Sequence, residues 1–141
     1  MNSHTSTLSP RSPTSTYWLI KSLAQPSIPG EHLGSTMAST ADKFTGRIII
    51  TATLTAQEGQ GDRVEAQLKV IQEYALSDKD PGCFTFRVCR SDNEFFVFEE
   101  YENQAAIQAH LDADVFKAFS AEVAKGTFIV GGPRAIFYEE K

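Results

Sequence analysis

One histidine offers acid–base chemistry in the part of the chain that carries sustained apolar patterning. His110 is the only histidine between residues 42 and 141, and it shares a helical face with Ala106 and Ile107. A histidine side chain has an unperturbed pKa of about 6.5, so it can take a proton from a phenolic hydroxyl at neutral pH. We therefore expect His110 to be a catalytic base. The alternative is a structural histidine, hydrogen-bonded beneath its helix.

A carboxylate on a predicted strand is the second catalytic candidate. Glu99 alternates with large apolar residues on one strand face, where a buried carboxylate needs a partner. It could orient His110, as the third group of a catalytic triad does, or it could pair with Arg87 across a hairpin. Glu100 lies on the opposite strand face and would take either role if the facing were reversed.

Aromatic residues predict a pocket for a flat substrate. The chain holds 10 Phe and 4 Tyr but one Trp, and side chains of this size need a core or a ligand cavity to cover them. We expect two or three of the rings to touch a substrate and the others to form core. The residues predicted to contact a small aromatic metabolite are Tyr101, Phe86, Arg87, Phe116 and Phe119.

The sequence predicts neither a metal site nor a cofactor. One histidine in the patterned region and no cysteine pair at ligand spacing leave no ligand set for zinc or iron. Cys83 and Cys89 lie six residues apart on one predicted strand, which separates them by roughly 20 Å, too far for a disulfide. Two unpaired thiols and the lack of an Asn-x-Ser/Thr acceptor predict a cytoplasmic protein.

The charge balance excludes two classes of partner. The net charge is −5 and the pI is near 5.1, with no cluster of Lys or Arg. Binding to nucleic acid depends on basic side chains that neutralise phosphates, and binding to anionic membranes needs a similar patch. The longest apolar runs have the length of strands and are too short to span a bilayer. We expect neither nucleic acid nor membrane as a partner.

Periodicity predicts seven segments after residue 46. Strands are expected at 47–55, 83–90, 94–101 and 127–139, the last interrupted at 131–133. Asp62 and Glu65 form a capping box at the start of one helix, while Asn103 and Asp114 cap two further helical stretches. The order β-α-β-β-α-β predicts the α+β ferredoxin-like fold, with a four-stranded antiparallel sheet and its helices on one face.

The third strand predicts a homodimer. Phe95 and Val97 point to one face of the sheet, whereas Phe96 and Phe98 point to the other. Helices of one chain can cover only one of these faces, and an exposed apolar patch indicates an interface. Two sheets packed face to face would cover it.

The first 41 residues differ in composition from the rest. They hold fifteen Ser and Thr and four of the six Pro, but only three charged residues, a composition that does not support a packed core. We interpret 1–41 as a disordered tail and 42–141 as one domain. Two alternatives are a transit peptide and a true start at Met37.

Four motifs in order resemble the antibiotic biosynthesis monooxygenase family. They are DPGCFTF at 80–86, FVFEEY at 96–101, AAIQAHL at 105–111 and VFKAF at 115–119. No single motif is specific, but their order and spacing form the match, which covers roughly residues 46–140. The resemblance implies a dimeric α/β barrel. The recurrent positions of the family fall on Glu99, Tyr101, His110, Phe116 and Phe119.

The resemblance also implies an activity. Characterised relatives oxidise polyketide anthrones or hydroquinones with O2 and use neither metal nor flavin, so the first expectation is a cofactor-independent monooxygenase acting on a phenolic, anthrone or quinol-like metabolite. Haem degradation fits less well, because that branch carries a Trp on strand three and a late-helix His, where this chain has Ser120 and its one Trp is Trp18. An inert dimeric barrel, serving in stress response or ligand binding, stays open, as does a non-oxidative isomerase or decarboxylase.

Overall fold

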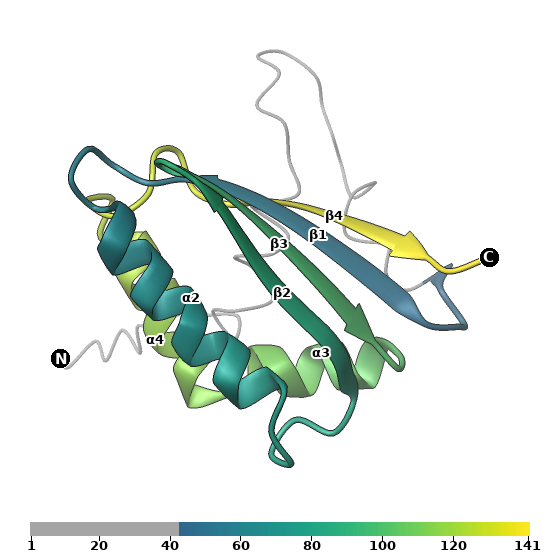
Figure 1. Ribbon diagram of the computed structural model, residues 1–141. Helices are drawn as coiled ribbons and strands as arrows, with labels where there is room; N and C mark the ends of the chain where they lie inside the picture. Colours follow the sequence, from purple (N-terminus) through teal and green to yellow (C-terminus); the bar gives the residue numbers. More distant parts are fainter. Residues whose placement is uncertain (1–42) are drawn as a thin grey trace, which may run out of the picture.

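A computed structural model of the protein describes residues 43–141 (Figure 1). The predicted tail, with its possible start at Met37, lies outside the described residues. The elements are β1 (Ile48–Thr55), α2 (Gly61–Ala75), β2 (Cys83–Ser91), β3 (Glu94–Tyr101), α3 (Gln104–Leu111), α4 (Asp114–Ala124) and β4 (Arg134–Glu139).

The four strands form one antiparallel sheet in the order β2-β3-β1-β4. The three helices lie on one side of the sheet, and α2, α3 and α4 gather beneath β2 and β3 (Figure 1). The β-α-β-β-α-α-β order confirms the predicted ferredoxin-like α+β fold. Among the described residues, no helix is long and apolar enough to cross a bilayer.

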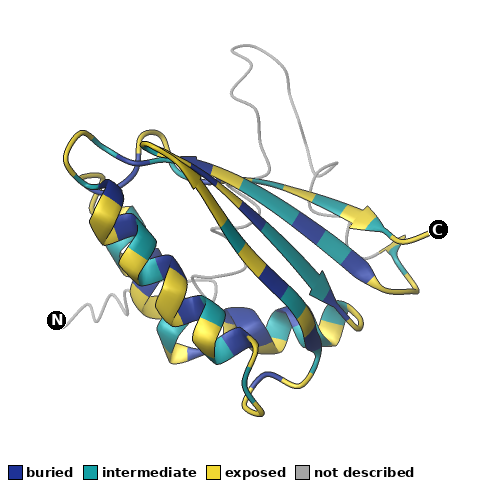
Figure 2. Ribbon diagram, in the orientation of Figure 1, coloured by how far each residue is buried: buried dark blue, intermediate teal, exposed yellow. Residues whose placement is uncertain are grey.

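The core lies between the helices and the inner face of the sheet (Figure 2). On β3, Phe95, Val97 and Tyr101 are buried while Phe96 between them is exposed, as their period of two predicts. The helix α2 contributes one apolar stripe, which contains Leu68 and Ile71. Burial of this stripe removes apolar surface from water and holds the helix against the sheet.

The predicted capping box at the start of α2 is wrong. The N-cap is Gln60, which makes no side-chain capping bond, and the helix begins at Gly61. The Nη1 atom of Arg90 contacts Asp62 at 2.8 Å and Glu65 at 2.6 Å. Both acidic side chains therefore pair with the end of β2 instead of capping their own helix.

The second helical region contains two separate helices. Asn103 caps α3 as predicted, because its side chain accepts a hydrogen bond from the Ala106 amide at 2.9 Å. Ala113, and not Asp114, is the N-cap of α4. Asp114 still lies in the first turn, where its negative charge interacts favourably with the positive end of the helix dipole.

The last strand is shorter than predicted. It begins at Arg134, whereas Ile129 forms only an isolated bridge with Ala56. Between them the backbone turns at Gly131 and Gly132, which have φ angles of 66° and 89°. These values favour glycine, so the two glycines end the extended stretch that the sequence suggested.

A β-bulge changes which residues of β2 face the helices. The register shifts between Cys83 and Thr85, so that Phe84 is the extra residue. Cys83 is consequently buried with Phe86, while Phe84 is 45% exposed. Strict alternation along 83–90 would place Phe84 and Phe86 on one face and Cys83 on the other, and the bulge instead puts Cys83 on the face of Phe86.

Candidate active site

An apolar pocket lies between the inner face of the sheet and the helices. It contains about 660 Å³ of space not filled by atoms, its open mouth included. Its walls come from β1, β2, β3 and β4, from all three helices and from Pro133 before β4. Glu99 is the one charged residue among the described residues that line it. Such a pocket suits a largely apolar ligand with one polar group.

Glu99 and Tyr101 provide the polar groups of the pocket wall. They lie two residues apart on β3, so their side chains share a face. The Tyr101 hydroxyl donates a hydrogen bond to Oε2 of Glu99 at 2.5 Å. Burial raises the pKa of the Glu99 carboxyl, which makes it a stronger base than an ordinary glutamate, while burial and the Glu99 charge raise the pKa of Tyr101.

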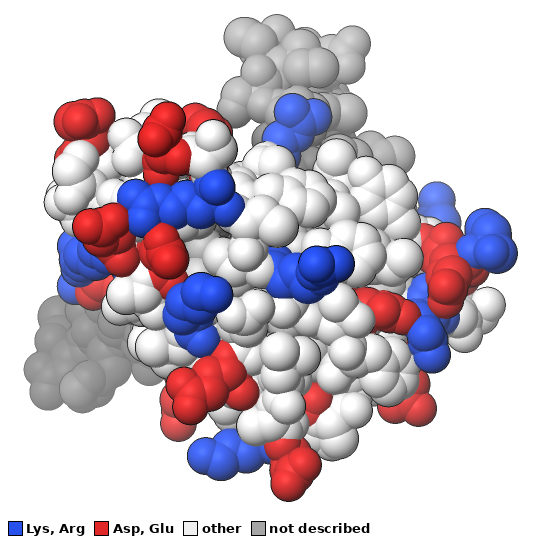
Figure 3. All heavy atoms as spheres, in the orientation of Figure 1, with Lys and Arg blue, Asp and Glu red and all other residues white. Residues whose placement is uncertain are grey.

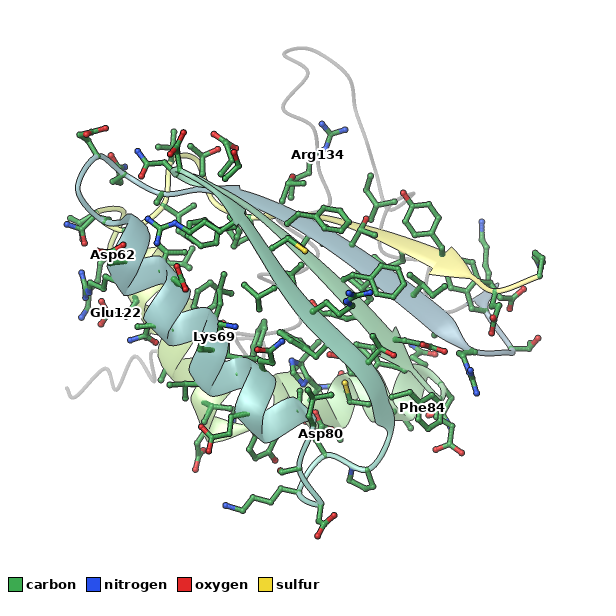
Figure 4. All side chains as sticks on the ribbon, in the orientation of Figure 1. Asp62, Lys69, Asp80, Phe84, Glu122 and Arg134 are labelled. Carbon is green, nitrogen blue, oxygen red and sulfur yellow. The ribbon has the colours of Figure 1, made fainter. Side chains whose placement is uncertain are left out.

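His110 is buried directly beside this pair. It is 1% exposed, and its Nδ1 atom lies 2.7 Å from Oδ2 of Asp80, which is itself 3% exposed. Asp80 belongs to the turn between α2 and β2 and lies near α3 (Figure 4). The partner of His110 is therefore Asp80, and Glu99 does not take the orienting role that the sequence suggested for it.

Three aromatic rings separate His110 from the pocket. The ring centroids of Phe86, Tyr101 and Phe116 lie 5.7, 5.3 and 5.5 Å from that of the imidazole. All three residues line the pocket, whereas His110 itself does not. The Nε2 atom of His110 is buried and has no hydrogen-bond partner among the described residues.

The pocket brings together most, but not all, of the predicted substrate-binding residues. Tyr101, Phe86, Phe116 and Phe119 line it. Arg87 does not: it is exposed and pairs in register with Phe98, on the sheet face away from the helices. Because Glu99 faces inward, the suggested pairing of Arg87 with Glu99 is not formed.

Cys83 lies beside Tyr101 and would be a possible nucleophile of the site. Burial raises the pKa of the Cys83 thiol to about 12, so this cysteine is not a reactive nucleophile, and both cysteines are free. Among residues 43–141, no three His, Cys, Asp or Glu side chains gather as metal ligands.

The sequence did not predict a role for Asp80. The one signal it offered was the place of Asp80 in the DPG turn of a matched motif.

Similarity to solved structures agrees with this fold. A "putative antibiotic biosynthesis monooxygenase" from Caulobacter crescentus is 27% identical over 70% of this chain and 92% of its own, with a TM-score of 0.61. A protein from Pseudomonas aeruginosa (17% identity, 70% of this chain, 97% of its own, TM-score 0.61) shares the fold. So does one from Mycobacterium tuberculosis (14% identity, 67% and 95%, TM-score 0.61).

No curated protein resembles the chain closely enough to count as a match. The sequence model of the antibiotic biosynthesis monooxygenase family, by contrast, matches residues 47–122. This segment runs from the start of the sheet almost to the end of α4 and includes Asp80, Glu99, Tyr101 and His110. The chain belongs to the antibiotic biosynthesis monooxygenase family.

Proposed function

We propose that the protein is a monooxygenase that needs no cofactor and oxidises a small phenolic, anthrone or quinol-like metabolite with O2. The observation that supports this most directly is the pocket, whose apolar walls carry one carboxyl group hydrogen-bonded to a phenol. A flat aromatic molecule fits such walls, and its hydroxyl group would meet Glu99.

The reaction begins with removal of the hydroxyl proton. The Glu99 carboxylate takes this proton, because it lies in the pocket wall and its pKa is raised by burial. His110 lies close enough for its charge, when protonated, to lower the pKa of Glu99. We assign His110 as the second proton acceptor, because its ring packs against that of Tyr101 and its Nε2 atom has no partner among the described residues.

The phenolate or enolate that results is rich in electrons and can pass one to O2. In an anthrone, the reacting methylene carbon then gains one oxygen atom as a carbonyl and loses both of its hydrogens. The second oxygen atom leaves as water, and the substrate supplies all four electrons that the O2 molecule accepts. The apolar walls lower the polarity of the surroundings in which the reacting atoms would lie.

Oxygen uptake tests this function. The purified protein, treated with a metal chelator, would be mixed with a panel of anthrones and hydroquinones in an oxygen-electrode cell. We expect consumption of one O2 for each anthrone converted to its quinone, at a rate proportional to protein concentration. Uptake no faster than the buffer control across the panel would reject the proposal and leave the inert barrel or a non-oxidative enzyme.

We further propose that the working unit is a homodimer joined through the outer face of the sheet. Phe84, Phe96, Ile136 and Tyr138 are each 41–45% exposed. Figure 3 shows a mostly uncharged area over the strands, with a basic side chain within it and mixed acidic and basic side chains around it. Burial of these side chains against a second copy would remove them from water.

A further inference from the structure

We propose that Asp80 is a positioning residue that holds the His110 imidazole in the tautomer with its proton on Nδ1, so that Nε2 is left free to accept a proton. This inference rests on the proposed function, in which His110 is the second proton acceptor. The burial of Asp80 and His110 and the contact between them support it.

The hydrogen bond fixes the tautomer. An ionised carboxylate can only accept hydrogen bonds, so the short contact between Asp80 and Nδ1 requires a proton on Nδ1. In a neutral imidazole the other nitrogen then carries a lone pair. That nitrogen, Nε2, is buried and has no hydrogen-bond partner among the described residues.

The surroundings of Nε2 explain why this tautomer matters. A buried polar atom without a partner is costly for stability, so an Nε2 atom that stays unpaired among the described residues indicates a role in function. The rings around the imidazole belong to Phe86, Tyr101 and Phe116, which also form the pocket wall. A proton that reached Nε2 would give an imidazolium whose Nδ1 remains in contact with the Asp80 carboxyl.

The fold places Asp80 with little freedom. Its amide donates to the Ser77 carbonyl at 3.2 Å, and its carbonyl accepts from the Cys83 amide at 3.1 Å. Gly82 then presses against α3, since a Cβ atom there would lie 2.4 Å from Cβ of Ala106. Ala106 precedes His110 by four residues and shares its helix face, so the close approach at Gly82 brings Asp80 to the imidazole.

The first experiment reads the tautomer without any substrate. Protein labelled with 15N in histidine gives ring nitrogen shifts that distinguish a protonated nitrogen from one with a lone pair. His110→Gln identifies the His110 signals among the three histidines of the chain. We expect Nδ1 of the wild type to carry the proton, and the Asp80→Asn variant to hold less of this tautomer. An unprotonated Nδ1 in the wild type would overturn the inference.

The second experiment reads the consequence for proton transfer. Asp80→Asn would be compared with Asp78→Asn, an exposed aspartate in the same turn. We expect Asp80→Asn to lower kcat by about 10²–10⁴-fold, the usual contribution of a positioned base. KM should stay unchanged, because Asp80 does not line the pocket. Asp78→Asn should retain the wild-type kcat.

A bound phenol separates this inference from the proposed function. The ionised fraction of bound 4-nitrophenol is measured by its absorbance and requires no oxygenation. We expect Asp80→Asn to reduce that fraction and Asp78→Asn to leave it unchanged. If no compound consumes O2, the proposed function fails, while the tautomer and the nitrophenol still decide the role of Asp80. If Asp80→Asn keeps both the wild-type tautomer and the wild-type ionised fraction, the positioning role is rejected.

Discussion

The hydroxyl of Tyr101 donates a hydrogen bond of 2.5 Å to the carboxyl of Glu99, and both side chains open onto the same pocket. A phenolic substrate bound at this wall would donate the same kind of hydrogen bond to the Glu99 carboxyl. Under the proposed function, the reacting hydroxyl would therefore bind beside this pair. The first prediction concerns Glu99.

Glu99→Gln should abolish most turnover while the fold is retained. Glutamine has nearly the same shape and can still accept the Tyr101 hydrogen bond, but it cannot take a proton. We expect kcat to fall by about 10²–10⁴-fold in the oxygen-uptake assay. Glu94→Gln is the control, because Glu94 is an exposed residue at the start of the same strand. Equal loss in both variants would show that Glu99 is not the base.

The raised pKa of Glu99 predicts a pH-dependent stability. Because burial raises this pKa above the ordinary value of 4.5, the folded protein binds more protons than the unfolded chain in a window that begins near pH 4.5. The contribution of the Glu99 carboxyl to the free energy of unfolding is therefore present below that pH, and it is lost as the pH rises through the folded pKa. Urea unfolding at a series of pH values should show that the wild type loses stability relative to Glu99→Gln across this window. A constant difference would contradict the shift.

Asp80 and His110 should be energetically coupled. Removal of one partner leaves a buried polar group without its contact, so Asp80→Ala or His110→Ala should each lower the free energy of unfolding by about 3–5 kcal/mol. The double variant should lose clearly less than the sum of the two single losses. Urea denaturation of the four proteins gives the coupling free energy. Additive losses would mean that the contact contributes nothing to the folded state.

Gly82→Ala should destabilise the protein, because the new methyl group would overlap Ala106 on α3. Overpacking of this kind costs about 1–3 kcal/mol. Gly46→Ala provides the control, since its Cβ would come no nearer than 4.0 Å to Glu139. Thermal unfolding of the two variants should separate them. Equal melting temperatures would show that the turn and α3 can move apart freely.

The outer face of the sheet should control the assembly state. Ile136→Glu places a charge on that face and should shift the protein toward the monomer, because a buried unpaired charge disfavours association. Val70→Glu is the control, because Val70 is an apolar residue of similar exposure (51%) that lies on α2 and not on the sheet. Light scattering should give twice the chain mass of 15.5 kDa for the wild type and for Val70→Glu. A wild-type mass near 15.5 kDa would reject the dimer.

Local periodicity predicted the strand that carries the candidate site. The period of two along β3 separates Glu99 and Tyr101 from Glu100, and the structure shows that the face of Glu99 is the one turned inward. The contact between Asp80 and His110 could not be predicted in this way. The residues lie 30 positions apart, and their approach depends on how a turn packs against a helix.

The bulge in β2 was hidden for a related reason. One extra residue leaves the composition of a strand unchanged, and it shows only when the partner strand fixes which residues lie opposite. Strict alternation along β2 therefore holds from Thr85 onward and fails at Cys83 and Phe84. Likewise, the apolar residues Phe128 and Ile129 suggested a strand, but they are buried in the connection that precedes β4.

The same bulge bears on how the sheet ends. β2 is an edge strand, so one row of its backbone N–H and C=O groups has no neighbouring strand within the described chain. An irregular edge is a poor template for another extended chain, and Arg87 and Arg90 add charge along it. Straightening β2 by deletion of Phe84 would create a regular edge. The shortened protein would then be expected to add strands from other molecules and to form fibrils on heating, a failure from which the extra residue protects the natural sheet.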